Sequence, residues 1–149
     1  MDFHLRMMRH VKILLVYRPP GLSTSLLLEE FSKLLEHVTA DLRHRRLLIV
    51  GDFNNHVDNS NDATARQFLD FLDSFDFVQH VREKTHANGH TLDLVISNAM
   101  DHFVNDIKTT DPVISDHLAV HSTLHLEKPR FLKEVGSSRN LCRIDMNSF

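Results

Sequence analysis

Apolar residues follow two kinds of pattern along the chain. The first kind, which consists of short apolar runs and of alternating apolar and polar residues, predicts six strands. Some of the segments are short and almost continuously apolar, which is typical of strands buried on both faces. Others alternate apolar and polar residues, which is typical of strands with one buried face. In order, the predicted strands are Val11–Tyr17, Leu47–Val50, Phe77–Val81, Leu92–Ser97, Ile107–Thr110 and Leu118–Leu126.

The second pattern, in which apolar residues recur every three to four positions, predicts two amphipathic helices. The first follows Ser23 or Ser25, either of which can cap it, and the second follows Asn61 or Asp62. The apolar face of the first helix comprises Leu27, Phe31, Leu34, Leu35, Val38 and Leu42, and that of the second comprises Ala65, Phe68, Leu69 and Leu72. Basic residues 43–46 suit the negative end of the first helix. The order strand, helix, strand, helix and then strands predicts a layered α/β domain.

Composition narrows the class of protein. The chain has 149 residues, of which 42% are hydrophobic and 25% charged, as expected for one soluble globular domain. A net charge of -3 gives no basic field, so nucleic-acid binding through bulk charge is not supported. The single cysteine, Cys142, excludes an internal disulfide framework and a Cys-rich zinc module. No signal peptide or membrane span is recognisable, so we expect an intracellular protein.

Three regions are expected along the chain. Residues 1–10 carry no apolar periodicity and are expected to be irregular. Residues 11–126 contain all the predicted helices and strands, and therefore form the domain. Residues 127–149 become polar and contain Pro129 and Gly136, which indicate a linker.

Polar side chains gather where predicted strands begin or end. Asp52 and Asn54 follow Gly51 at the exit of a buried strand, where a carboxylate and a carboxamide can face one cleft and offer oxygen atoms to a cation or to water. Taken alone, each such residue is also compatible with a turn or a solvated position. The full set is Tyr17, Asp52, Asn54, Asp93, Asp116 and His117.

Two groups of histidines offer other metal hypotheses. His117, His121 and His125 are four residues apart, which would align them on a helix as zinc ligands. Because the leucines between them alternate with polar residues, we favour a strand with exposed histidines. His86 and His90 flank the turn residues Asn88–Gly89, and we interpret them as surface residues without an acidic partner.

Four short motifs stand out in chain order, namely Tyr17–Gly21, Gly51–Asn54, Thr91–Ser97 and Ser115–His117. Together they resemble the endonuclease/exonuclease/phosphatase superfamily, and in particular the endonuclease domain of LINE-type (non-LTR) retrotransposon polyproteins. The resemblance covers residues 11–126, and Arg143–Phe149 resembles the connector that leads toward a reverse transcriptase in such polyproteins. Each motif is short, but the set in this order is specific.

The resemblance implies a deoxyribonuclease I-like fold, a four-layer α/β/β/α sandwich, and phosphodiester hydrolysis of DNA with Mg²⁺ or Mn²⁺. Asp52 would deprotonate the attacking water, and Asn54 would hold Asp52 or the phosphate. His117 would bind a phosphate oxygen, and Asp93 would accept the other ring proton of His117. Asp116 would be a metal ligand or orient one, and Tyr17 would contact the phosphate.

The chain also departs from the family pattern. An asparagine after the family's first strand and a metal-binding glutamate after a later one have no equivalent here. The chain is therefore expected to be the C-terminal half of the domain. Two expectations follow from this, weak binding of Mg²⁺ or Mn²⁺ and an apolar sheet face that needs the N-terminal half or another partner to cover it.

Three functional hypotheses follow. The first is a retrotransposon-type DNA endonuclease, impaired by the missing residues and nuclear if active, with no membrane partner. The second is a non-catalytic relic or interaction fragment. The third is a phosphatase of the same superfamily acting on phosphoinositides or sphingolipids. The Tyr17–Gly21 motif and the connector-like tail favour the first hypothesis over the third.

Overall fold

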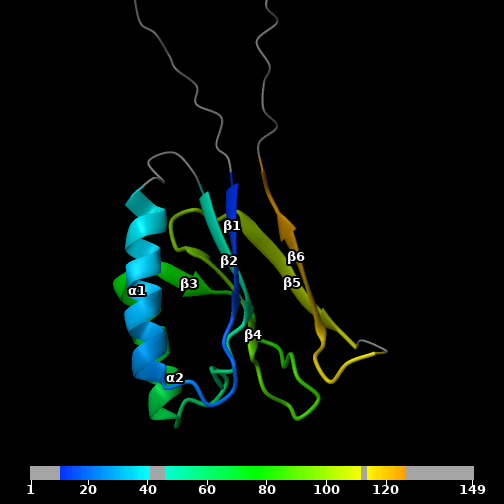
Figure 1. Ribbon diagram of the computed structural model, residues 1–149. Coiled ribbons are helices and arrows are strands. Elements are labelled where there is room, and N and C mark those ends of the chain that lie inside the picture. The colour runs from blue at the N-terminus through cyan, green and yellow to red at the C-terminus, as the bar shows by residue number, and fades with distance from the viewer. Residues whose placement is uncertain (1–10, 41–45, 112–113, 127–149) are drawn as a thin grey trace, which may run out of the picture.

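A computed structural model describes residues 11–40, 46–111 and 114–126 (Figure 1). The predicted alternation of strands and helices is confirmed. The elements are β1 (Val11–Tyr17), α1 (Thr24–Ala40), β2 (Arg46–Asp52), α2 (Ala63–Ser74), β3 (Phe77–Gln79), β4 (Asp93–Asn98), β5 (Val104–Thr110) and β6 (Ala119–Leu124).

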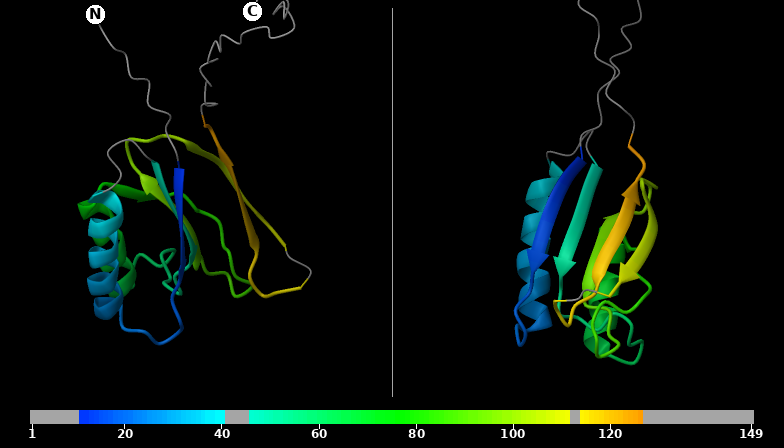
Figure 2. Two further views of the ribbon diagram at one scale, coloured as in Figure 1. Left: turned by 45° about the horizontal axis from the view of Figure 1, so that its top comes forward. Right: turned by 90° about the vertical axis from the view of Figure 1, so that its right-hand side faces the viewer.

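The strands form two sheets that lie on one another. The larger sheet has the order β1-β2-β4-β3, in which β1 and β2 are parallel and the other neighbours antiparallel. Strands β5 and β6 form a two-stranded antiparallel sheet. Figure 2 shows α1 and α2 on one side of the larger sheet and the β5–β6 pair on the other. The described residues therefore form one helix layer and two sheet layers, which corresponds to part of the predicted four-layer α/β/β/α sandwich.

Two hydrophobic clusters hold these layers together. The first lies between the helices and the larger sheet and includes Leu27, Phe31, Leu35, Leu47, Ile49, Phe53, Phe68, Leu72, Phe77, Leu94 and Ile96. The second lies between the two sheets and includes Leu48, Val81, Val95, Phe103 and Val104. Strands β2 and β4 contribute to both clusters, which explains why Leu47–Val50 is apolar without alternation.

Polar residues cap both helices at the predicted positions. The Ser23 hydroxyl accepts a hydrogen bond from the backbone N–H of Leu26 at 3.3 Å, and the Asp62 carboxylate accepts one from Thr64 at 2.8 Å. The predicted apolar faces are wrong at one position in each helix. Leu34 and Leu69 are each 38% exposed, because they lie at the flank of an apolar stripe that only one sheet covers.

Several predictions fall outside the described residues. These are the irregular segment 1–10, Leu42, most of the basic cluster 43–46 and the linker 127–149, so the domain limits stay predictions. Within the described ranges, neither helix combines the length and the apolarity that a membrane span requires.

One face of β1 is apolar and open. Ile13 and Leu15 lie opposite Leu48 and Val50 in the parallel register, so they share the face that β2 turns toward the β5–β6 pair. Ile13 is 66% exposed and Leu15 78% exposed, because the β5–β6 pair does not cover β1 at these two positions. The structure thus exposes the apolar sheet face that the sequence predicts.

Gly51 sits where β1 and β2 approach most closely. Its φ of +144° lies in a region that favours glycine, and a Cβ atom added there would be 1.8 Å from the carbonyl oxygen of Val16. Val16 is the register partner of Gly51, so the clash would be with the backbone of the neighbouring strand. The parallel pairing at the exit of β2 therefore requires glycine.

Replacing Gly51 by alanine tests this requirement. Gly51→Ala is expected to lower the free energy of unfolding by about 3 kcal/mol or more, because the Val16 carbonyl cannot move without disrupting the ladder. Gly21→Ala is the matched control, since Gly21 also has a positive φ, +84°, but has no atom near the added Cβ. Urea denaturation measures both variants, and equal losses would contradict the steric explanation.

The open face predicts self-association of the isolated chain. The double variant Ile13→Thr with Leu15→Thr keeps residues suited to strands and removes exposed apolar area, so it should be more monomeric with little change in Tm. Size-exclusion chromatography with light scattering measures the effect. A wild-type chain that is already a monodisperse monomer would contradict the prediction.

Candidate active site

Three of the predicted site residues form a row across the larger sheet. Tyr17 is the register partner of Asp52 on the neighbouring strand β1, and Asp52 is the partner of Asp93 on β4. Register partners point to the same face of a sheet, and this face is the one opposite the helices. The row lies at the lower end of the larger sheet in Figure 1, where β1 and β2 end and β4 begins.

Asn54 holds the carboxylate of Asp52 with two hydrogen bonds. The backbone N–H of Asn54 donates to one carboxylate oxygen at 2.9 Å, and the Asn54 side-chain amide donates to the other at 3.0 Å. Asn54 has a positive φ of 43°, a conformation that asparagine tolerates better than most residues. The side chain of Asp52 is thereby fixed at the strand exit.

Arg18 joins the turn after β1 to the exit of β2. Its backbone N–H donates to the Asp52 carbonyl at 2.8 Å, and its own carbonyl accepts from the Asn54 side chain at 2.8 Å. The guanidinium is buried and donates to the carbonyls of Phe53 and Leu22 and to the Thr24 hydroxyl. Sequence reasoning included Arg18 only as part of a motif. An arginine placed directly before two prolines was the available signal that it has a role in the turn.

His117 is paired with Asp93. The Nδ1 atom of His117 is 2.9 Å from a carboxylate oxygen of Asp93, which leaves Nε2 free for another contact. The hydrogen bond with Asp93 raises the pKa of His117, and the negative charges of Asp93, Asp52 and Asp116 add to the effect against a smaller opposing effect of burial. The ring of His117 is thus more readily protonated near neutral pH than an ordinary histidine.

His86 also belongs to this group, and its interpretation as a surface residue without an acidic partner is wrong. The His86 side chain is 13% exposed, its Nε2 lies 3.2 Å from a carboxylate oxygen of Asp116, and its ring packs edge-on against His117 with centroids 4.9 Å apart. The spacing in the sequence could not reveal this contact, because His86 and Asp116 are brought together only by the pairing of two loops.

Thr85 anchors those two loops. Its hydroxyl accepts the backbone N–H groups of Leu92 and Asp93, each at 2.9 Å, and its carbonyl accepts the N–H of Leu118 at 2.7 Å. Thr85 is fully buried, so these bonds are shielded from water. Residue 85 therefore positions both Asp93 and the segment that carries His117, and sequence reasoning missed it within a polar turn.

The arrangement concentrates three carboxylates, those of Asp52, Asp93 and Asp116, around His117. Carboxylates directly opposite each other on neighbouring strands repel, and Asp52 and Asp93 are placed in this way. The raised pKa of His117 favours its protonated form, whose positive charge offsets the repulsion. Such a site can present a fixed carboxylate to water and a cationic donor to an anionic oxygen.

The described side chains do not by themselves fit a magnesium site. Within this site, the group with metal-ligand spacing is His86, Asp116 and His117, which offers one carboxylate and two imidazoles. Mg²⁺ prefers about six oxygen ligands, and Mn²⁺ also favours oxygen over imidazole. Asp116 supplies one such oxygen, and both oxygens of Asp52 already accept hydrogen bonds from Asn54.

The structure brings together all six residues that the sequence nominated, though not equally. Hydrogen bonds join Asn54 to Asp52 and His117 to Asp93, and strand register joins Asp52 to Asp93. Asp116 is linked to this group through His86, whose ring packs on His117. Tyr17 shares the row, but it is 68% exposed on the edge strand. The catalytic and binding roles assigned to these residues stay predictions.

Comparison with known proteins identifies one family, and eleven chains of solved structures also match. The family model described as "Endonuclease-reverse transcriptase" matches residues 11–121. The endonuclease domain of TRAS1, a telomere-specific non-LTR retrotransposon, is similar in structure, with a TM-score of 0.59 and 20% sequence identity. The similarity covers 76% of this chain and 56% of the TRAS1 chain, so the described fold corresponds to about half of that domain. No curated protein matches the sequence.

The Asp93–His117 pair predicts a measurable titration. The raised pKa means that the folded protein binds the His117 proton more tightly than the unfolded chain. The resulting stabilisation is fully present below the ordinary histidine pKa of about 6.5 and is lost as the pH rises through the higher pKa of the folded state. Histidine ring NMR signals should show His117 titrating above 6.5 in the wild type and lower in Asp93→Asn. An unchanged His117 pKa in Asp93→Asn would contradict the assignment.

Proposed function

Because the chain belongs to the endonuclease-reverse transcriptase family, we propose that it is a DNA endonuclease domain of the retrotransposon type, which hydrolyses a phosphodiester bond. The observation that carries the proposal is the convergence of two hydrogen-bonded pairs, Asp52 with Asn54 and Asp93 with His117, at one end of the larger sheet. Asp52 and Asn54 are neighbours in the sequence, whereas Asp93 and His117 are 24 residues apart and come from other segments.

Asp52 is the base in the proposed reaction. A water molecule attacks the phosphorus and transfers a proton to Asp52, while the bond between the phosphorus and the 3′ oxygen breaks. The products are a 3′ hydroxyl, which takes up a proton, and a 5′ phosphate. Asn54 keeps the Asp52 carboxylate in place through its two hydrogen bonds, which reduces the cost of orienting the base.

His117 binds the phosphate in this proposal. Its protonated ring donates from Nε2 to a non-bridging oxygen, where negative charge increases during attack. Asp93 holds the opposite ring nitrogen and favours the charged form, and Tyr17 at the open edge contacts a neighbouring phosphate. The positive charge of His117 is needed because three carboxylates surround the site and would otherwise repel DNA.

The family implies a divalent cation, and we propose that Mg²⁺ or Mn²⁺ binds this chain weakly, with Asp116 as its ligand. The reason is the shortage of oxygen ligands among the described side chains. Activity should accordingly be low for the chain alone. We also propose that an active form works in the nucleus, where its DNA substrate is found.

A non-catalytic fragment is the second candidate function. Two observations favour it, the poor fit to Mg²⁺ and the open apolar face at Ile13 and Leu15. A partner that covers this face, such as the N-terminal half of an endonuclease domain, could supply the missing ligands. In the absence of such a partner, the chain would retain phosphate contacts without turnover.

A plasmid-nicking assay with Mg²⁺ or Mn²⁺ tests the proposed activity. The wild-type chain should convert supercoiled DNA to nicked circles, and His117→Ala and Asp52→Asn should each slow the reaction by about 100-fold or more, because each removes a group that acts in the transition state. His37→Ala is the matched control, since His37 is exposed on α1 and should leave the rate unchanged.

Two results would count against the endonuclease proposal. Equal nicking by the wild type and by His117→Ala would assign the activity to a different site or to a contaminant. No nicking by a folded wild-type chain would favour the non-catalytic fragment.

A further inference from the structure

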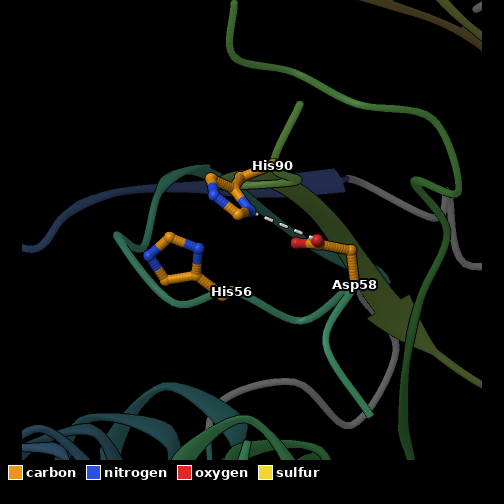
Figure 3. A group of neighbouring side chains, drawn as sticks. All are labelled: His56, Asp58 and His90. Atoms are coloured by element: carbon orange, nitrogen blue, oxygen red, sulfur yellow. Dashed lines mark hydrogen bonds and ion pairs between the residues drawn. The ribbon is translucent and has the colours of Figure 1, made fainter. Parts of the chain in front are cut away.

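A second cluster of metal-ligand type lies outside the proposed active site. It comprises His56 and Asp58, from the loop that follows β2, and His90, from the turn that precedes β4. One ligand atom from each side chain lies within 4.8 Å of the others. Figure 3 shows the two imidazole rings and the carboxylate converging from these separate segments. None of the three residues takes part in the proposed hydrolysis.

Backbone hydrogen bonds hold the side chain of Asp58 and the main chain of His90 in place. One oxygen of Asp58 accepts the backbone N–H of Thr91 at 3.0 Å, which leaves the other oxygen directed at His90. The carbonyl of His90 accepts the N–H groups of Thr85 and His86 at 2.8 and 3.0 Å. The site is therefore built on loops whose positions are fixed independently of any ligand.

The contact between His90 and Asp58 is long for an ionic hydrogen bond and matches the spacing of two ligands on one metal ion. The Nδ1 atom of His90 is 3.4 Å from an oxygen of Asp58, whereas an ionic N–H···O bond is normally about 2.7–2.9 Å long. Two ligand atoms on a tetrahedral Zn²⁺, each bound at about 2.0–2.1 Å, are about 3.3 Å apart. The ring of His56 lies edge-on to that of His90, with centroids 4.2 Å apart, so it approaches the same point.

The ligand types and the solvent access of the cluster also suit a cation. Asp58 supplies a carboxylate, and His56 and His90 supply imidazoles. The side chains of His90 and Asp58 are 41% and 31% exposed, so an ion can enter from solvent. Ionised carboxylates and neutral imidazoles are the forms that bind metal.

We propose that His56, Asp58 and His90 bind one Zn²⁺ ion, with water in the fourth position. Two imidazoles and one carboxylate are a common three-ligand set for zinc, and imidazole ligands select Zn²⁺ over Mg²⁺. The ion would join the loop after β2 to the turn before β4. Because the first carries Asn54 and the second carries His86, the ion would act as a clip between two parts of the proposed active site.

The proposal does not depend on nuclease activity, and its test measures binding directly. Isothermal titration of the full chain with ZnCl₂ should show one more equivalent bound by the wild type than by the double variant His56→Ala with His90→Ala. Histidine ring NMR signals of His56 and His90 should shift in step with the first equivalent. Zn²⁺ should raise the Tm of the wild type and leave that of the double variant unchanged at the same zinc concentration.

Two further variants separate this cluster from its neighbours. His37→Ala, which removes an exposed histidine of α1, should bind zinc like the wild type. Asp58→Asn keeps the size of the side chain and should weaken binding by at least about tenfold. Equal stoichiometry and affinity in the wild type and the double variant would overturn the proposal, because the zinc would then bind elsewhere, for example at His86, Asp116 and His117.

Discussion

The close approach of β1 and β2 at Gly51 is the constraint on which the site depends. The absence of a side chain lets the Val16 carbonyl lie where a Cβ would otherwise be, and so permits parallel pairing up to the last residue of each strand. That register places Tyr17 beside Asp52, and the antiparallel register of β4 then places Asp93 on the other side of Asp52. A shift of one residue in either pairing would turn Asp52 away from its partners.

Once the strand register is set, local hydrogen bonds fix the positions of the charged side chains in the site. Asn54 and Arg18 fix the exit of β2, and Thr85 fixes the start of β4 together with the segment that carries His117. Two carboxylates thereby face each other, an arrangement that costs stability unless a cation lies between them. The hydrogen bond with Asp93 and the nearby carboxylates raise the pKa of His117, which favours its positively charged form. This charge reduces the repulsion between the carboxylates, and it also suits a phosphate oxygen.

The sequence predicted the elements and most of the site, because strand periodicity and the positions of Gly51 and the prolines are local signals. The helix cap at Asp62 also followed from a local signal, a polar residue directly before an amphipathic segment. The contacts of His86 and His90 could not be predicted, because they form between loops whose pairing is set by tertiary structure. Leu34 and Leu69 were placed in the core because periodicity defines the centre of an apolar stripe better than its edges.

The central claim is that Asp52, Asn54, Asp93 and His117 form one phosphate-binding site. Titrating the isotope-labelled chain with a short single-stranded DNA, without divalent metal, and following backbone and histidine NMR signals tests it most directly. We predict that the largest shifts fall at residues 17–18, 52–54, 85–86, 93 and 116–118, and that Asn54 and His117 saturate together. Shifts confined to the outer face of α1 or to the far end of the β5–β6 pair would contradict the claim.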